Sequence, residues 1–136
     1  FTSWSGLTVA ITPTAASSKI FITGMLTQSQ LNDSAVRIGE TINGGSVAGV
    51  LQGNQIGSNR TRATSGGNQF REASESMQST VSGVVSPSYT LTDELTYSWQ
   101  GWYGSGTMYT NRELTDTDND GDCTSMCTLT VMEIAA

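Results

Sequence analysis

The last alternating segment of the chain, residues 127–134 (CTLTVMEI), constrains the fold more than any other stretch. Apolar and threonine side chains alternate over its first five positions, and this period of two is typical of a β-strand with unlike faces. Met132 and Ile134 then fall on the threonine side, and Glu133 falls on the apolar side. Either a bulge near Met132 shifts the phase, or the strand is covered on both faces. In a small sandwich, the second cover would be another subunit.

Further short apolar segments follow one another between turn signals along the whole chain. Segment 20–26 also carries apolar side chains on both faces, like the last segment. No long segment has the 3.6-residue periodicity of an amphipathic helix, which excludes a helical domain. We therefore expect an all-β fold, an antiparallel β-sandwich or jelly roll of about eight strands. The expected strands are residues 7–11, 20–26, 36–42, 47–51, 80–85, 95–99, 108–111 and 127–134.

The segments between these strands contain turn residues. Asn43-Gly44-Gly45 is a strong turn signal. Residues 2–6 are predicted as a lead-in to the first strand, and residues 64–68 as a flexible, glycine-rich loop.

Composition limits the domain organisation and the possible partners. The 136 residues suffice for one domain with a core, so residues 1–136 are expected to form a single sandwich. The chain starts without Met, and we expect it to be the C-terminal part of a longer chain. Its net charge of −6 argues against nucleic acid or anionic membrane as a partner. No segment approaches the roughly 20 apolar residues of a membrane span.

The acidic segment 116–122 (DTDNDGD) resembles the first half of a calcium-binding loop. Calcium prefers several oxygen ligands, which alternating carboxylates and a backbone carbonyl can supply. The twelfth loop position is Cys127 rather than glutamate, which rules out an EF-hand. The alternative is a solvated Asp/Asn/Gly turn. Both interpretations stay open; the candidate calcium ligands are Asp116, Asp118, Asp120 and Asp122.

The two cysteines, Cys123 and Cys127, are candidates for a disulfide. On one extended strand their Cα atoms would lie about 13 Å apart, whereas a disulfide needs less than about 7 Å. They can pair only if the chain turns back between them, and two unpaired thiols are the alternative. A zinc site is not expected, because the chain has no histidine and only two cysteines.

Aromatic residues are concentrated near the end of the predicted aromatic strand. Trp99 is expected in the core. Trp102, Tyr103 and Tyr109 are candidates for binding a receptor glycan, since sugar faces stack on aromatic rings. Without histidine the usual Ser/His and Cys/His nucleophiles are absent. We therefore expect a protein that is not an enzyme.

Three segments also resemble a known protein family. They are GLTVAITPTAASSKIFITG at 6–24, SPSYTLTDELTY at 86–97, and NRELTDTDN at 111–119 followed by CTLTVMEIA at 127–135. In this order they resemble the C-terminal head domain of bacteriophage tail-fibre and related virion proteins. The resemblance implies a homotrimeric jelly roll of the C1q/TNF type, located on the virion with other virion proteins as partners.

The function that this resemblance implies is structural. The first expectation is a tail-fibre head that contacts a glycan or protein of the host surface. The second is a capsid decoration or cement protein with the same fold. The alternative from another class is a tailspike-like glycan hydrolase, with two carboxylates as catalytic groups.

Overall fold

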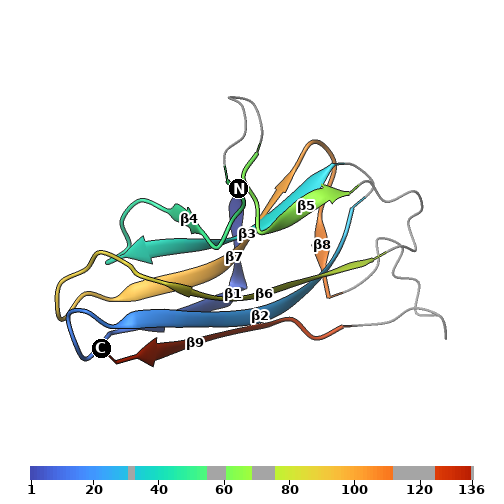
Figure 1. The fold of residues 1–136 in the computed structure, drawn as a ribbon. Coiled ribbons are helices and arrows are strands. Elements are labelled where there is room, and N and C mark those ends of the chain that lie inside the picture. The colour runs from blue at the N-terminus through green and yellow to red at the C-terminus, as the bar shows by residue number, and fades with distance from the viewer. Residues whose placement is uncertain (31–32, 55–60, 69–75, 112–124, 136) are drawn as a thin grey trace.

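A computed structural model describes residues 1–30, 33–54, 61–68, 76–111 and 125–135 (Figure 1). Its strands form two antiparallel sheets packed face to face, and no helix occurs among these residues. The predicted all-β antiparallel sandwich is therefore confirmed. The first sheet contains β1 (Thr2–Ile11), β3 (Ser34–Ile42), β4 (Ala48–Val50), β5 (Ser65–Asn68) and β7 (Leu95–Tyr103). The second contains β2 (Lys19–Ser29), β6 (Met77–Val85), β8 (Tyr109–Thr110) and β9 (Thr128–Ile134).

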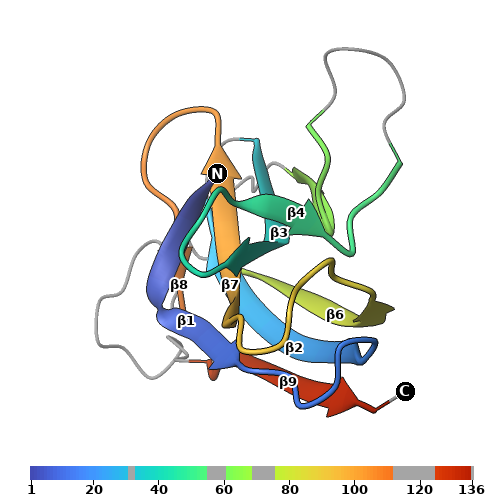
Figure 2. The same cartoon turned by 90° about the vertical axis from the view of Figure 1, so that its left-hand side faces the viewer.

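The strand order shows how the chain builds its two layers. The first sheet has the order β1-β7-β3-β4, with β5 also paired to β3. The second has the order β6-β2-β8, with β9 also paired to β2. The chain changes sheets between β1 and β2, β2 and β3, β5 and β6, β6 and β7, and β7 and β8, as the end view shows (Figure 2). Such connections between layers are typical of Greek-key and jelly-roll sandwiches.

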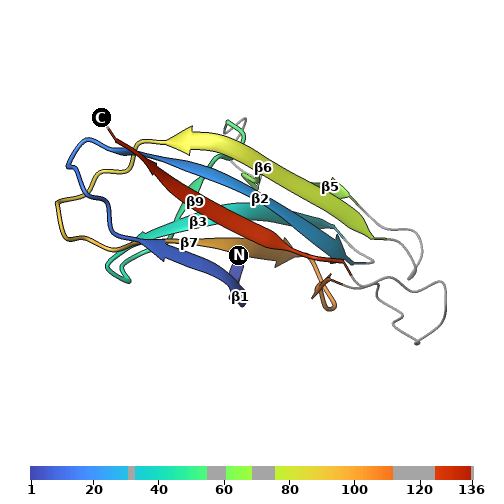
Figure 3. The same cartoon turned by 90° about the horizontal axis from the view of Figure 1, so that it is seen from below.

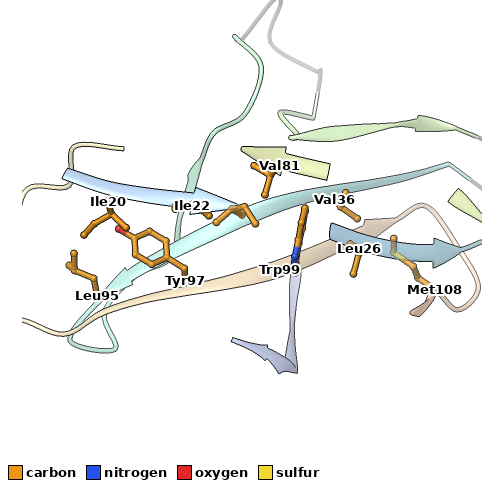
Figure 4. Close-up of a cluster of buried hydrophobic side chains, with 10 residues drawn as sticks. Ile20, Ile22, Leu26, Val36, Val81, Leu95, Tyr97, Trp99 and Met108 are labelled. Atoms are coloured by element: carbon orange, nitrogen blue, oxygen red, sulfur yellow. The ribbon is translucent and has the colours of Figure 1, made fainter. Parts of the chain in front are cut away.

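The core lies between the sheets and follows the alternation seen in the sequence. On the inner face of β2, Ile20, Ile22 and Leu26 are fully buried. On the inner face of β7, Leu95, Tyr97 and Trp99 are fully buried, as the period of two predicts. Trp99 and Tyr97 are the largest of these buried side chains (Figure 4). Burying apolar surface contributes about 25 cal/mol per Å². The buried cluster comprises Ile20, Ile22, Leu26, Val36, Ile38, Val81, Leu95, Tyr97, Trp99 and Met108.

Two local predictions were wrong. Residues 65–68 form β5, where Ser65 pairs with Val36 and Gly66 with Ala35. A glycine-rich segment has little strand propensity of its own, so pairing with β3 decides its conformation. Residues 2–6 belong to β1 rather than to a lead-in, and the register of β1 against β7 shifts between Ser3 and Thr8.

The predicted turn at residues 43–45 is confirmed. Asn43 and Gly44 have φ angles of 49° and 69°, and Gly45 N donates to Ile42 O at 2.9 Å. Positive φ angles at both positions explain why asparagine and glycine occur there.

Strand β9 pairs with β2 without interruption, from Thr128 opposite Met25 to Ile134 opposite Lys19. The predicted alternative of a bulge near Met132 is therefore wrong, and the strand carries apolar side chains on both faces. Glu133 lies on the inner side and accepts hydrogen bonds from the backbone N–H groups of Thr14 and Ala15, at 2.8 and 3.2 Å. This carboxylate fixes the end of β9 to the β1–β2 turn.

Within the described ranges, no helix is long and apolar enough to cross a membrane.

Candidate functional site

The outer face of the second sheet is the first candidate site. Side chains that point away from the core form three rows across β6, β2 and β9, and Ile134 of β9 lies next to them, as the register of these strands shows. Figure 3 views the molecule from this side. We call this surface the neutral face; it comprises Phe21, Thr23, Met25, Thr80, Ser82, Val84, Thr128, Thr130, Met132 and Ile134.

The neutral face contains no charged residue, although the chain has twelve acidic and six basic residues. Three of its apolar side chains are well exposed: Val84 to 47%, Met132 to 51% and Ile134 to 43%. Lys19 of β2, the pairing partner of Ile134, places one positive charge directly at the edge of this face. An uncharged surface with grouped apolar side chains is typical of a protein contact.

The middle of the neutral face is hollow. Its central row contains only Ser82, Thr23 and Thr130, which are smaller than Phe21 and Met132 in the next row. The hollow has a volume of about 350 Å³ and is lined mainly by hydroxyl-bearing side chains around Met25. A side chain from a facing surface could fill this hollow, so the shape of the neutral face suits packing against another protein surface.

The predicted aromatic site lies at the other end of the molecule from the C-terminus. Trp102 and Tyr103 end β7 and are exposed to 37% and 42%. Tyr109 begins β8 opposite Ser29 and is half-buried. Trp99 lies in the core as expected, with an exposed fraction of 0%. Sequence reasoning thus separated the core tryptophan from the exposed aromatic residues.

A guanidinium that sequence reasoning missed lies beside Trp102. Arg37 of β3 pairs with Gln100, two residues before Trp102 on β7. The three side chains therefore share the outer face of the first sheet. Along the sequence, the closest pair of basic residues is Arg60 and Arg62 instead. Only the register of β3 against β7 brings Arg37 to the aromatic residue.

The predicted calcium ligands Asp116, Asp118, Asp120 and Asp122 lie outside the described residues, as does Cys123. The calcium loop and the disulfide therefore stay predictions. Among the described residues Cys127 has no disulfide partner, and its sulfur lies 3.3 Å from the backbone nitrogen of Thr27, which donates to it. Burial raises the pKa of the Cys127 thiol, so the thiol is less reactive than a free cysteine. In the described ranges, no group of three or more acidic or cysteine side chains could hold a metal.

The described carboxylates near turns have structural partners. Asp93 accepts from Thr90 N at 2.8 Å and from Asn43 Nδ2 at 2.7 Å. Glu40 accepts from the Tyr97 hydroxyl at 2.8 Å. These contacts hold strand ends and turns in place.

The sequence matches no protein-family model and no curated protein, and the structure matches no solved structure.

Proposed function

We propose that this chain is the head domain of a virion structural protein, assembled as a homotrimer at the end of a tail fibre. In this position it contacts other virion proteins and the surface of the host cell. The proposal joins the sequence resemblance to one structural observation, the neutral face. That face supports assembly, and the exposed Trp102 and Tyr103 support contact with a host ligand.

The charge distribution favours the neutral face as the contact between subunits. Copies of a chain with net charge −6 repel one another, and this repulsion is weakest where the facing surfaces carry no charge. Val84, Met132 and Ile134 are each about half exposed, so a facing subunit would bury apolar area. Each Å² buried contributes about 25 cal/mol.

The assembly is tested by sedimentation equilibrium of the wild-type chain and two variants. We expect the wild type to have three times the monomer mass. Met132→Asp should lower the mass to that of a monomer, because a buried carboxylate without a partner costs several kcal/mol. Leu91→Asp is the matched control, since Leu91 is 49% exposed and belongs to the connection between β6 and β7 rather than to the neutral face. It should keep the wild-type mass. A wild-type chain that is monomeric at every concentration would contradict the homotrimer.

The position on the virion is tested separately by electron microscopy with an antibody against this domain. Label at fibre ends supports the proposal. Label spread over the capsid would replace it with a decoration protein. Incubation with host polysaccharide is the third arm, because a shortened polysaccharide would instead indicate a glycan hydrolase.

A further inference from the structure

The outer face of the first sheet holds an arginine in a fixed position. Arg37 donates from Nε to Gln100 Oε1 at 2.8 Å. Its guanidinium also lies over the ring of Phe1, with Cζ 4.1 Å from the ring centroid. Stacking on an aromatic face occupies one flat side of the guanidinium and leaves its nitrogen edge available.

The partner of Arg37 is itself held by neighbouring side chains. Gln100 is 2% exposed and donates from Nε2 to Ser3 Oγ at 2.9 Å. The Ser3 and Ser98 hydroxyls are hydrogen-bonded at 3.2 Å. Gly39 leaves the space that Gln100 fills, since a Cβ there would lie 2.5 Å from Gln100 Cδ. Arg37 is thus oriented by a buried polar chain rather than by solvent.

The positive charge of Arg37 has no negative partner within the described part of the chain. Among the described residues, Arg37 interacts with the side chains of Gln100 and Phe1, and neither side chain carries a negative charge. Burial lowers the pKa of Arg37, which reflects a partly desolvated cation. An anion bound to the two Nη atoms would compensate this desolvation, because arginine binds planar anions through two parallel hydrogen bonds.

The aromatic side chain next to Arg37 on this face is that of Trp102. Trp102 is diagonal to Arg37 across the β3–β7 ladder, a relation that places Cα atoms about 7–8 Å apart. Phe1 precedes Thr2, which pairs with Gly101, so it flanks the same position from β1 (Figure 2). An exposed indole beside an oriented guanidinium is suited to bind a ligand that has both a ring with an apolar face and a carboxylate.

We propose that Arg37 and Trp102 form a binding site for a carboxylate-bearing sugar. The carboxylate accepts from the Arg37 Nη atoms, and the sugar ring stacks on the indole of Trp102. The site deepens the proposed host contact and rests on it for the source of the ligand. Binding itself needs neither the trimer nor the virion, so its test can fail independently of the proposed function.

The first test is an NMR titration of the whole chain with three probes, following the Arg37 Nε–H and the Trp102 Nε1–H signals. Methyl glucuronide should shift both signals. Methyl glucoside, which lacks the carboxylate, should bind at least about tenfold more weakly. Acetate should shift the Arg37 signal without the Trp102 signal. Equal affinity for glucuronide and glucoside, or an unshifted Arg37 signal at roughly 0.1 M probe, would overturn the proposal.

Variants then separate this site from a general effect of charge. Arg37→Gln should weaken glucuronide binding at least about tenfold, and Arg37→Lys should give an intermediate affinity because it lacks the fork of donors. Arg62→Gln is the matched control, since Arg62 is exposed and donates from Nε to Gly53 O at 3.0 Å. An equal loss in Arg62→Gln would contradict the site. If Arg37→Gln does not fold, the Arg37→Lys variant and the three probes decide.

Discussion

The indole Nε1 of Trp99 donates to the carbonyl oxygen of Thr128 at 3.0 Å. Trp99 belongs to β7 of the first sheet and Thr128 begins β9 of the second, so this bond connects the two layers. Gly24 of β2 lies beside it. A Cβ at this position would be 2.7 Å from Thr128 O and 3.2 Å from Trp99 Nε1. The connection between the layers therefore requires a glycine at position 24.

Gly24→Ala should destabilise the fold by about 1–3 kcal/mol, because the added methyl group overpacks this contact. Gly6→Ala is the matched control, since a Cβ at Gly6 meets no atom within 4 Å, and it should change stability by less than about 0.5 kcal/mol. Urea unfolding followed by tryptophan fluorescence measures both variants. Equal midpoints for the two variants would show that the close contact at Gly24 carries no energy.

Tyr97 should make the protein lose stability at alkaline pH. Burial, and then the hydrogen bond to Glu40 and its charge, raise the pKa of Tyr97 far above its usual value. A tyrosine in the unfolded chain ionises near pH 10. Above that pH the unfolded state has released a proton that the native state retains, so the free energy of unfolding falls as pH rises.

Tyr97→Phe should flatten this alkaline loss, which thermal melts between pH 8 and about 11 would measure. The exposed Tyr103→Phe is the control and should leave the slope unchanged. A Tyr97→Phe variant with the wild-type slope would refute the assignment to Tyr97.

Asp93 should contribute to the fall in the free energy of unfolding at acid pH. The Thr90 backbone N–H, the Asn43 amide and the Thr90 hydroxyl hold the pKa of Asp93 below its usual value. This contribution is present above the ordinary aspartate pKa of about 4 and is lost as pH falls through the lower folded value. Asp93→Asn should therefore lose less stability than the wild type between pH 5 and about 2.

The control for Asp93 is Asp33→Asn, which removes the same charge from an exposed side chain without these donors. Melts across the acid range compare the three proteins. An unchanged acid slope in Asp93→Asn would mean that other groups govern acid unfolding.

The acidic segment 116–122 gives a prediction that calcium can test directly. If its aspartates bind calcium, the melting temperature should rise with calcium concentration as RT ln(1 + [L]/Kd). Asp118→Asn combined with Asp120→Asn should abolish the rise. Identical melting curves in calcium and in chelator would indicate that the segment is a solvated turn that does not bind calcium. The double substitution would then leave stability unchanged or raise it slightly, by removing like charges.

Much of the fold follows from local patterns. The alternation of Leu95, Tyr97 and Trp99 identified both the strand and its buried face, because side chains of a strand point to opposite sides with a period of two. Asn43 and Gly44 identified a turn, because they tolerate positive φ angles. The pattern also separated Trp99 from Trp102. These two residues are three positions apart on the same strand, so Trp99 faces the core and Trp102 faces outward.

Other elements depended on their neighbours. Ser65 to Asn68 lacks the side chains that favour a strand, and only its pairing with β3 makes it one. The same holds for the start of β1, where Thr2 and Ser3 pair with Gly101 and Gln100 of β7. Local sequence carries no signal for such segments, because their hydrogen-bond partners are distant in the chain.

The sequence by itself determined the class of fold, the core faces of the long strands and the presence of apolar residues on both faces of β2 and β9. Only the tertiary structure decided which strands are neighbours. That choice collected Val84, Phe21 and Met132 into one uncharged surface and placed Arg37 next to Trp102. The physical reason is that alternation fixes the side to which a residue points, whereas the residue beside it is set by the register between strands distant in sequence.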